Sequence, residues 1–290
     1  QTKLMKRNVL VSELRSTAIS TQADVKAYLE KQEEAGNAKD IQSFFIVNGM
    51  AVTATKEVME KIASFPEVEM ITPNEEVQLY PSVEAPAGTT AENDKNTPTN
   101  DNVEWNIQQV GAPQAWEMGV DGQGAVVAVM DTGVQWNHPA LMHQYRGFDP
   151  ANPNSPTHTY SFFDAVSGQS AAYDDHGHGT HVAGTAVGGE QNGTNKIGVA
   201  PGAKWIGVKI LNSSGSGSQA QILNGAQWLL APTDANGNPN PAMAPDIVNN
   251  SWGGGAGMNE WFRPMVQAWR AADIYPVFAA GNTTLTNPGG

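Results

Sequence analysis

The stretch GAVVAVMDTG, residues 124–133, is an apolar run that ends in a carboxylate and a glycine. Near-continuous apolar runs are typical of strands that are buried on both faces of a parallel sheet. Three further apolar runs follow along the chain, at 203–211 (AKWIGVKIL), 246–251 (DIVNNS) and 274–280 (IYPVFAA). Segments with a helical pattern lie between these runs, at 178–188, 218–230 and 259–272. The alternation predicts an α/β domain with a parallel sheet and right-handed crossovers.

The first 80 residues differ from the rest, because only two of the chain's 30 glycines, Gly36 and Gly49, lie there. Their apolar spacing and turn residues predict strands at 8–14, 41–47, 50–55 and 68–72, and helices at 21–36 and 56–64. The Asn48-Gly49 pair is a strong hairpin signal between the two central strands. The order β-α-β-β-α-β is that of a small ferredoxin-like α+β domain.

Residues 81–102 are rich in Pro, Ala, Thr and Asn and have no periodicity, which is typical of a linker. A length of 290 residues, at roughly 150 per domain, agrees with two domains. The predicted organisation is therefore a small domain at 1–80, a linker at 81–102 that holds a processing site, and a larger domain at 103–290.

The composition excludes several classes of protein. With 16 basic and 29 acidic residues the net charge is −13, which argues against nucleic acid as a partner. The absence of cysteine excludes disulfides, cysteine-ligated zinc and a thiol nucleophile. No apolar run approaches the roughly 18 residues that span a membrane. The chain begins Gln1-Thr2-Lys3 with no signal peptide, so a signal was removed or the sequence was cut there.

Polar residues follow the predicted strands and open one helix. Asp131, Ser251 and Asn282 come at the carboxyl ends of apolar runs, and His178 begins the helix at 178–188. Reacting groups of parallel α/β sheets collect at that edge. A carboxylate, an imidazole and an amide match the groups needed for acyl transfer, in which they orient a base, deprotonate a hydroxyl and stabilise an oxyanion.

These residues lie in motifs that occur in a fixed order along the chain. The motifs are DTGV with NHP at 131–139, HGTHVAG at 178–184, GVAP at 198–201, NNSWGG at 249–254 and AAGN at 279–282. In order and spacing they resemble the subtilisin-like serine proteases, whose Asp…His…Ser order is well known. For residues 103–290 the resemblance implies a parallel-sheet catalytic domain that is incomplete. Residues 6–80 resemble the inhibitory propeptide of the family, which is also ferredoxin-like.

The resemblance implies a role for each motif residue. Asp131 would be the charge-stabilising acid, His178 the general base and Asn282 the side-chain donor of the oxyanion hole. The backbone of Ser251, Trp252 and Gly253 would pair with a peptide substrate as an added strand. His138 and His181 match structural histidines of the motifs, and His176 has no assigned role.

One expected motif is missing from the chain. The nucleophile of the family lies in Gly-Thr-Ser-x-Ala-x-Pro, and this motif does not occur in the 290 residues. In the family it follows the AAGN strand, which here is close to Gly290. Ser251 lacks the sharp strand-to-helix turn that would expose its oxygen. We therefore expect a C-terminally truncated fragment of an endopeptidase precursor, without its nucleophile serine and inactive by itself.

The resemblance also implies a propeptide tail that occupies the substrate cleft. Residues 75–80 (EEVQLY) resemble such a tail, with Tyr80 as the residue before the cut. Because Pro81 would directly follow the scissile bond and disfavours cleavage there, a cut within 81–102 is the alternative. The chemistry requires no cofactor. A structural calcium ion is a further possibility: Ala140 stands where related enzymes place an Asp ligand, and the loop 189–198 either supplies oxygens or is only a polar loop.

Three other functions were considered. His176, His178 and His181 form an H-x-H-x-x-H run that would suit zinc in a metallohydrolase. Alternatively, residues 1–80 act as an inhibitor and folding chaperone bound to an incomplete domain. A dinucleotide-binding fold is excluded, because the glycines at 119, 122 and 124 precede their strand. The expected partners are protein or peptide substrates and the chain's own propeptide, with no nucleic acid and no membrane. The expected location is extracellular.

Overall fold

The computed structural model describes residues 2–79, 103–193, 195–253 and 260–282. The chain divides into two compact units. The first comprises Gln1–Glu76, Ser218–Ala244 and Asn259–Tyr275, and the second comprises Val77–Gly217, Pro245–Met258 and Pro276–Gly290. The linker expected at 81–102 lies outside the described residues, so it is still a prediction.

The predicted strand at 8–14 is wrong, because these residues lie inside the helix α1 (Lys3–Thr21). The buried residues of α1 are Arg7, Val11 and Ala18, whose spacings of four and seven place them on one side of a helix. Thr2 caps the first turn by accepting a hydrogen bond from the Met5 amide at 3.3 Å. The Val residues favour a strand locally, but the burial of this one side of the helix decides the structure.

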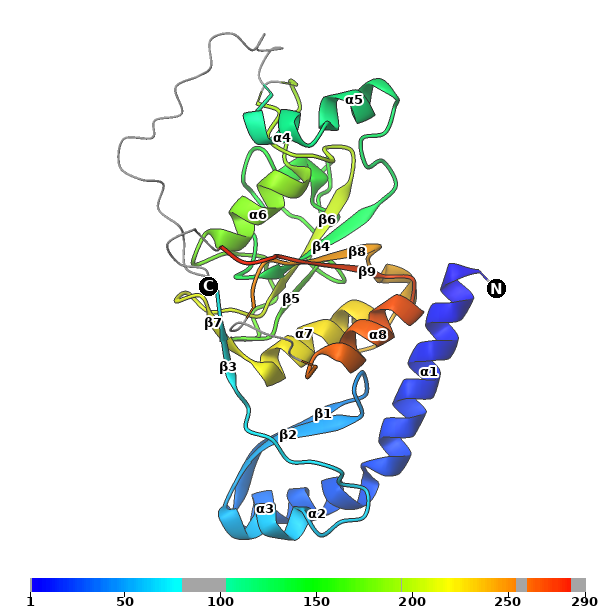
Figure 1. Ribbon diagram of the computed structural model, residues 1–290, viewed down its shortest axis with the longest axis vertical. Helices are drawn as coiled ribbons and strands as arrows, with labels where there is room; N and C mark the ends of the chain where they lie inside the picture. Colours follow the sequence, from blue (N-terminus) through cyan, green and yellow to red (C-terminus); the bar gives the residue numbers. More distant parts are fainter. Residues whose placement is uncertain (1, 80–102, 194, 254–259, 283–290) are drawn as a thin grey trace. The chain divides into compact units, whose positions relative to one another are not determined.

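The predicted hairpin is confirmed, because β1 (Ala38–Phe44) and β2 (Gly49–Ala54) pair antiparallel. Asn48 has a φ of 49° in the turn, a left-handed conformation that Asn tolerates. The two predicted helices are present as α2 (Ala23–Glu34) and α3 (Lys56–Ile62). Both pack on the hairpin (Figure 1), and the core between them contains Val25, Leu29, Ala38, Val58 and Ile62.

The predicted strand at 68–72 is also wrong, because these residues have no strand structure. Met70 and Ile71 are exposed, and the segment expected as the first strand of this sheet is helical. Within the described part of 1–80 the order is α1-α2-β1-β2-α3-β3, with β3 at Glu76–Gln78. The four-stranded ferredoxin-like sheet is therefore corrected to a two-stranded hairpin with helices.

The first unit also contains α7 (Gln219–Leu230), the 3-10 turn η2 (Pro241–Met243) and α8 (Arg263–Ala271). Both α-helices were predicted, and Ser218 and Gln221 form a capping box at the start of α7. The N-terminal residues of the unit contact these helices. The Phe45 amide donates to Gln227 Oε1 at 2.6 Å, and Arg7 Nε donates to the carbonyl of Ala272 at 2.9 Å.

The second unit contains a five-stranded sheet in the order β5-β6-β4-β8-β9 (Figure 1). Its strands are β4 (Val126–Asp131), β5 (Phe162–Asp164), β6 (Lys204–Lys209), β8 (Ile247–Asn250) and β9 (Tyr275–Phe278), of which Tyr275 belongs to the first unit. Strand β4 pairs in parallel with β6 and β8, and β5 pairs in parallel with β6. The α/β class is confirmed, and each of the four apolar runs contains a strand. Strand β5 was not predicted because it is too short to show a pattern.

The burial of β4 explains why its sequence is apolar. Ala128, Val129 and Met130 are fully buried, and β4 is a central strand with β6 and β8 as neighbours. Helix α6 (His178–Val187) adds Ala183 and Val187 to the core cluster that contains Val129. Short elements complete this unit: α4 (Trp105–Gln109), α5 (Ala112–Glu117), the 3-10 turn η1 (Met142–Gln144) and β7 (Ser216–Ser218). No helix in the described ranges has the length and hydropathy that a membrane crossing requires.

Candidate active site

Asp131 and His178, which lie 47 residues apart in the sequence, meet at one point of the second unit. Asp131 is the last residue of β4 and is fully buried, and His178 is the first residue of α6. The Oδ1 atom of Asp131 lies 2.8 Å from Nδ1 of His178. A carboxylate accepts, so we assign the imidazole proton to Nδ1, which leaves Nε2 as the basic nitrogen.

A glycine next to His178 allows this close approach. A Cβ atom on Gly179 would lie 2.0 Å from the carbonyl oxygen of Gly133 and 3.1 Å from Cβ of Asp131. The first turn of α6 therefore reaches the end of β4 only because position 179 has no side chain. Gly177, the N-cap of α6, has a φ of 98°, which also requires glycine for an unstrained backbone.

Asp174 also stabilises the first turn of α6 and the loop that precedes it. Its carboxylate accepts five hydrogen bonds, from the amides of His176, Gly177 and Thr180 and from the hydroxyls of Thr132 and Thr180. The Thr132 hydroxyl also accepts from the Gly179 amide at 2.9 Å. Asp174 thus connects the residue after Asp131 to the loop that leads into His178. The sequence motifs of the family resemblance do not include Asp174. An Asp three residues before a glycine N-cap could have indicated its role.

The pKa values of these residues follow from their contacts. The hydrogen bond to Asp131 raises the pKa of His178 above its usual value, and this outweighs the burial that would lower it. Burial would raise the pKa of Asp174, but the hydrogen bonds from Gly177 and Thr180 lower it overall. Asp174 is therefore a carboxylate at neutral pH, as its five donors require.

The residues predicted to bind substrate lie beside a strand of the chain itself. Gln78 forms an antiparallel bridge with Gly253, and β3 pairs with β7. The Leu79 amide donates to the carbonyl of Gly215 at 2.9 Å. A Cβ atom on Gly215 would lie 2.9 Å from Cδ1 of Leu79, so the missing side chain leaves room for leucine. The tail expected at 75–80 is thus paired with Gly253 on one side at Gln78, and with β7 and Gly215 on the other side as far as Leu79.

Trp252 and Ser251, the other two residues predicted to bind substrate, have different surroundings from Gly253. The indole of Trp252 is buried, and its Nε1 donates to the carbonyl of Met130 at 2.9 Å, so this side chain belongs to the core. The hydroxyl of Ser251 accepts from the Asn249 amide group at 2.8 Å. Among the three predicted residues, Gly253 is the one whose pairing with the tail is described.

Two predicted site residues are not tested by these contacts. Asn282 follows β9 and is exposed, and its role as an oxyanion donor is still a prediction. Tyr80, the predicted residue before the processing cut, lies outside the described residues.

The three histidines considered as zinc ligands, His176, His178 and His181, are not arranged as a metal site in the described structure. His178 uses Nδ1 for Asp131, and His176 Nδ1 accepts from the His178 amide at 3.3 Å. Throughout the described ranges, no group of three or more His, Asp or Glu residues is arranged to hold a metal ion. Within this run, His178 makes the contact with Asp131.

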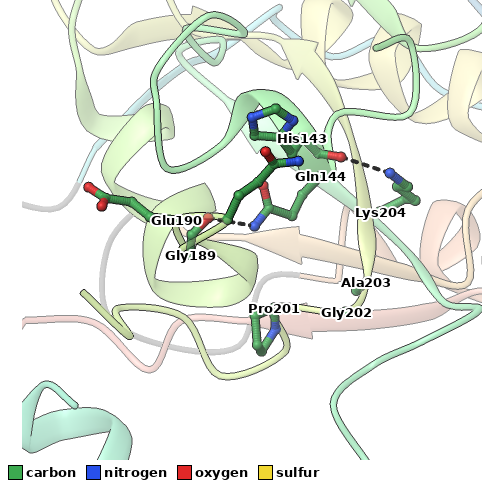
Figure 2. Close-up of a pocket in the computed structure, with 9 residues that line it drawn as sticks. His143, Gln144, Gly189, Glu190, Pro201, Gly202, Ala203 and Lys204 are labelled. Atoms are coloured by element: carbon green, nitrogen blue, oxygen red, sulfur yellow. Dashed lines mark hydrogen bonds between the residues drawn. The ribbon is translucent and has the colours of Figure 1, made fainter. Parts of the chain in front are cut away.

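A separate pocket of about 250 Å³ touches the loop where calcium was considered. Figure 2 shows His143, Gln144, Gly189, Glu190 and Lys204 around it. Gln144 donates to the carbonyl of Gly189 at 2.9 Å, and the Lys204 ammonium donates to the carbonyl of His143 at 2.7 Å. The buried Oε1 of Gln144 has no hydrogen-bond partner within the described chain. These contacts do not test whether the loop 189–198 binds calcium, which stays a prediction.

Comparison with known families agrees with this geometry. Residues 122–290 match the model of the Subtilase family, and residues 5–80 match the model of Peptidase inhibitor I9. The chain therefore belongs to the subtilase family of serine peptidases and carries an inhibitor-type propeptide region before its parallel sheet.

Several individual proteins are similar to the chain. Bacillopeptidase F of Bacillus subtilis (strain 168) is 56% identical over 290 residues, which are 100% of this chain and 20% of that protein. Thermitase of Thermoactinomyces vulgaris is 31% identical over 193 residues, 67% of this chain and 60% of that protein. The Minor extracellular protease Epr of Bacillus subtilis (strain 168) is 30% identical over 191 residues, 66% and 26% of the two chains. The chain thus spans only part of the length of each relative.

Replacing Gly179 by alanine should disrupt the start of α6. The new Cβ would meet a backbone oxygen, so the turn must shift, and we expect a loss of about 2 kcal/mol or more in urea unfolding. Gly184→Ala in the same helix is the matched control, because its Cβ would meet only Ile197 at 3.8 Å. That variant should be neutral or more stable by up to about 1 kcal/mol. Equal stabilities of the two variants would contradict the close-approach argument.

Asp131→Asn should lower the pKa of His178, measured by NMR titration of the imidazole, because the negative charge is removed and the neutral amide oxygen is a weaker acceptor than the carboxylate. A folded pKa above the usual 6.5 stabilises the fold fully below that pH, and this contribution is lost as pH rises through the folded pKa. The variant should therefore lose that part of the pH dependence of unfolding. Asp40→Asn, at a position whose side chain is 70% exposed, is the control. An unchanged His178 titration in Asp131→Asn would refute the assignment.

Proposed function

We propose that the chain is the propeptide and part of the catalytic domain of a secreted serine endopeptidase precursor. The observation that carries the proposal is the 2.8 Å hydrogen bond between Asp131 and His178 at the carboxyl end of β4. A buried carboxylate that accepts from Nδ1 keeps the imidazole in the tautomer whose Nε2 can take a proton. Family membership supports the same function.

In the proposed reaction His178 removes the proton of a serine hydroxyl, which then attacks the substrate carbonyl. The proton moves from the hydroxyl to Nε2, and Asp131 stabilises the imidazolium that forms. Nε2 then delivers this proton to the leaving amine. Asn282 would donate a hydrogen bond to the oxyanion; loss of such a donor in subtilisin costs about 10²–10³ in turnover.

The 290 residues contain no Gly-Thr-Ser-x-Ala-x-Pro motif, and we propose that they do not hydrolyse peptides by themselves. Ser251 would not replace the missing serine, because its hydroxyl is engaged by the side-chain amide of Asn249. The nucleophile would come from sequence that continues the catalytic domain. The processing cut would follow Tyr80 or fall within 81–102.

The second part of the proposal is that residues 1–80 inhibit the site as a substrate-like strand. The pairing of Gln78 with Gly253 and of Leu79 with Gly215 supports it, because a peptide substrate added as a strand would use the same backbone groups. Substrates would be proteins or peptides of varied sequence. An extracellular location is proposed because a relative is a minor extracellular protease.

A longer protein that contains the serine motif should react with a fluorophosphonate probe, and the 290-residue chain should not. The His178→Ala variant of the longer protein should lose labelling, because the serine then has no base; His143→Ala is the control. Labelling is read by fluorescence after electrophoresis. Labelling of the 290-residue chain, or full labelling of His178→Ala, would overturn the proposed function.

Residues 1–80, added as a separate polypeptide, should slow peptide hydrolysis by an active subtilase. Leu79→Asp should weaken the inhibition at least about tenfold, because a carboxylate would be desolvated where leucine packs against Gly215. Met70→Asp is the control, since Met70 is 70% exposed. The inhibition constant is measured with a chromogenic peptide. Absence of inhibition by the unmodified polypeptide would refute an inhibitory role.

A further inference from the structure

A buried lysine lies next to the candidate acid–base pair. Lys209 is the last residue of β6 and stands opposite Asp131 in the parallel register of β4 and β6. Its side chain is 1% exposed. Lys209 lies within the apolar run at 203–211, and no sequence motif indicates a role for it. An ammonium in such a position is costly unless its donors are paired.

All three donors of the ammonium have oxygen partners on different segments. Lys209 Nζ lies 2.7 Å from the carbonyl of Thr132, 2.8 Å from the carbonyl of Leu211 and 2.6 Å from the carboxylate of Asp175. An ammonium has three donors, so this arrangement uses each one. The centre of the Tyr173 ring lies 5.2 Å from Nζ, in a cation–π contact.

The first partner belongs to the segment that orients Asp131. The Thr132 amide donates to Oδ1 of Asp131 at 2.7 Å, the same oxygen that His178 contacts. The Thr132 hydroxyl accepts from Gly179 and donates to Asp174. Because Lys209 holds the carbonyl of Thr132, it restrains a residue that touches both the carboxylate and the first turn of α6.

The second partner belongs to the turn that receives the tail. Leu211 precedes a turn in which the Gly215 amide donates to the carbonyl of Asn212 at 2.9 Å. The carbonyl of Gly215 then accepts from the Leu79 amide. By holding the carbonyl of Leu211, Lys209 restrains the base of this turn and thereby the acceptor for a substrate-like strand.

The third partner belongs to the loop before His178. Asp175 is 41% exposed and lies between Asp174 and His176, in the loop that ends at His178. Its carboxylate balances the charge of the buried ammonium. Three segments, which supply the carboxylate, the imidazole and the strand acceptor, therefore meet at one nitrogen.

We propose that Lys209 is a positioning residue that couples the strand-binding turn at 212–215 to the Asp131–His178 pair. The inference rests on the proposed function only in assigning an acid–base role to Asp131 and His178. The coupling itself is a property of the fold. Replacement of a purely stabilising lysine would lower the overall stability without affecting these two places in particular.

The test uses the 290-residue chain and two readouts that need no hydrolysis. One readout is amide hydrogen exchange of Leu79, and the other is the downfield NMR signal of the His178 Nδ1 proton. In Lys209→Met, which removes the donors and keeps an apolar stem, Leu79 should exchange about tenfold faster, as expected for losing one restrained hydrogen bond. The Nδ1 signal should broaden or disappear in the same variant.

Lys204→Met is the matched control, because Lys204 begins the same strand and also donates to a carbonyl, that of His143. It should leave both readouts unchanged. The Thr157 amide, which donates to the Gly147 carbonyl at 2.8 Å, reports overall opening and should keep its exchange rate in Lys209→Met. Equal acceleration of Thr157 and Leu79 would mean a merely structural lysine and would overturn the proposal.

Lys209→Arg keeps the proposal testable if Lys209→Met does not fold. Arginine keeps the charge but places its donors differently, so the Leu79 exchange rate and the His178 Nδ1 signal should change together. A change in one readout without the other would contradict coupling. Because neither readout depends on peptide hydrolysis, an inactive longer enzyme would refute the proposed function and leave this test intact.

Discussion

The contact between the first turn of α6 and the end of β4 controls the geometry of the candidate site. It exists because Gly179 can lie where any Cβ would collide with the Gly133 carbonyl. Once the turn is there, the hydroxyl of Thr132 and the carboxylate of Asp174 satisfy its backbone donors. His178 is then held against Asp131 by backbone position, so its imidazole needs little further ordering for proton transfer.

Much of this arrangement could be predicted from sequence, for a physical reason. A strand buried on both faces needs a continuous apolar run, so β4 and β6 could be recognised without tertiary information. In a parallel sheet such strands place the residues that follow them at a common edge. Asp131 could therefore be predicted to lie at this edge, with His178 nearby at the start of the next helix.

The remaining features depend on partners that are distant in sequence. Lys209 is a polar residue inside an apolar run, and its partners at 132, 175 and 211 meet only after folding. Asp174 binds mainly backbone amides, which no side-chain pattern reveals. Residues 8–14 have strand-like composition, but the burial of Arg7, Val11 and Ala18 in one helix prevails.

The bond from Leu79 to Gly215 joins two parts of one polypeptide, so its strength depends on connectivity as well as on contact. A tethered partner acts at a high effective concentration, in the millimolar range for short flexible tethers. A cut between the two residues would leave every contact in place and change only this concentration. Release of the strand would then depend on dilution, and a weakly binding tail would suffice to keep the uncut chain closed.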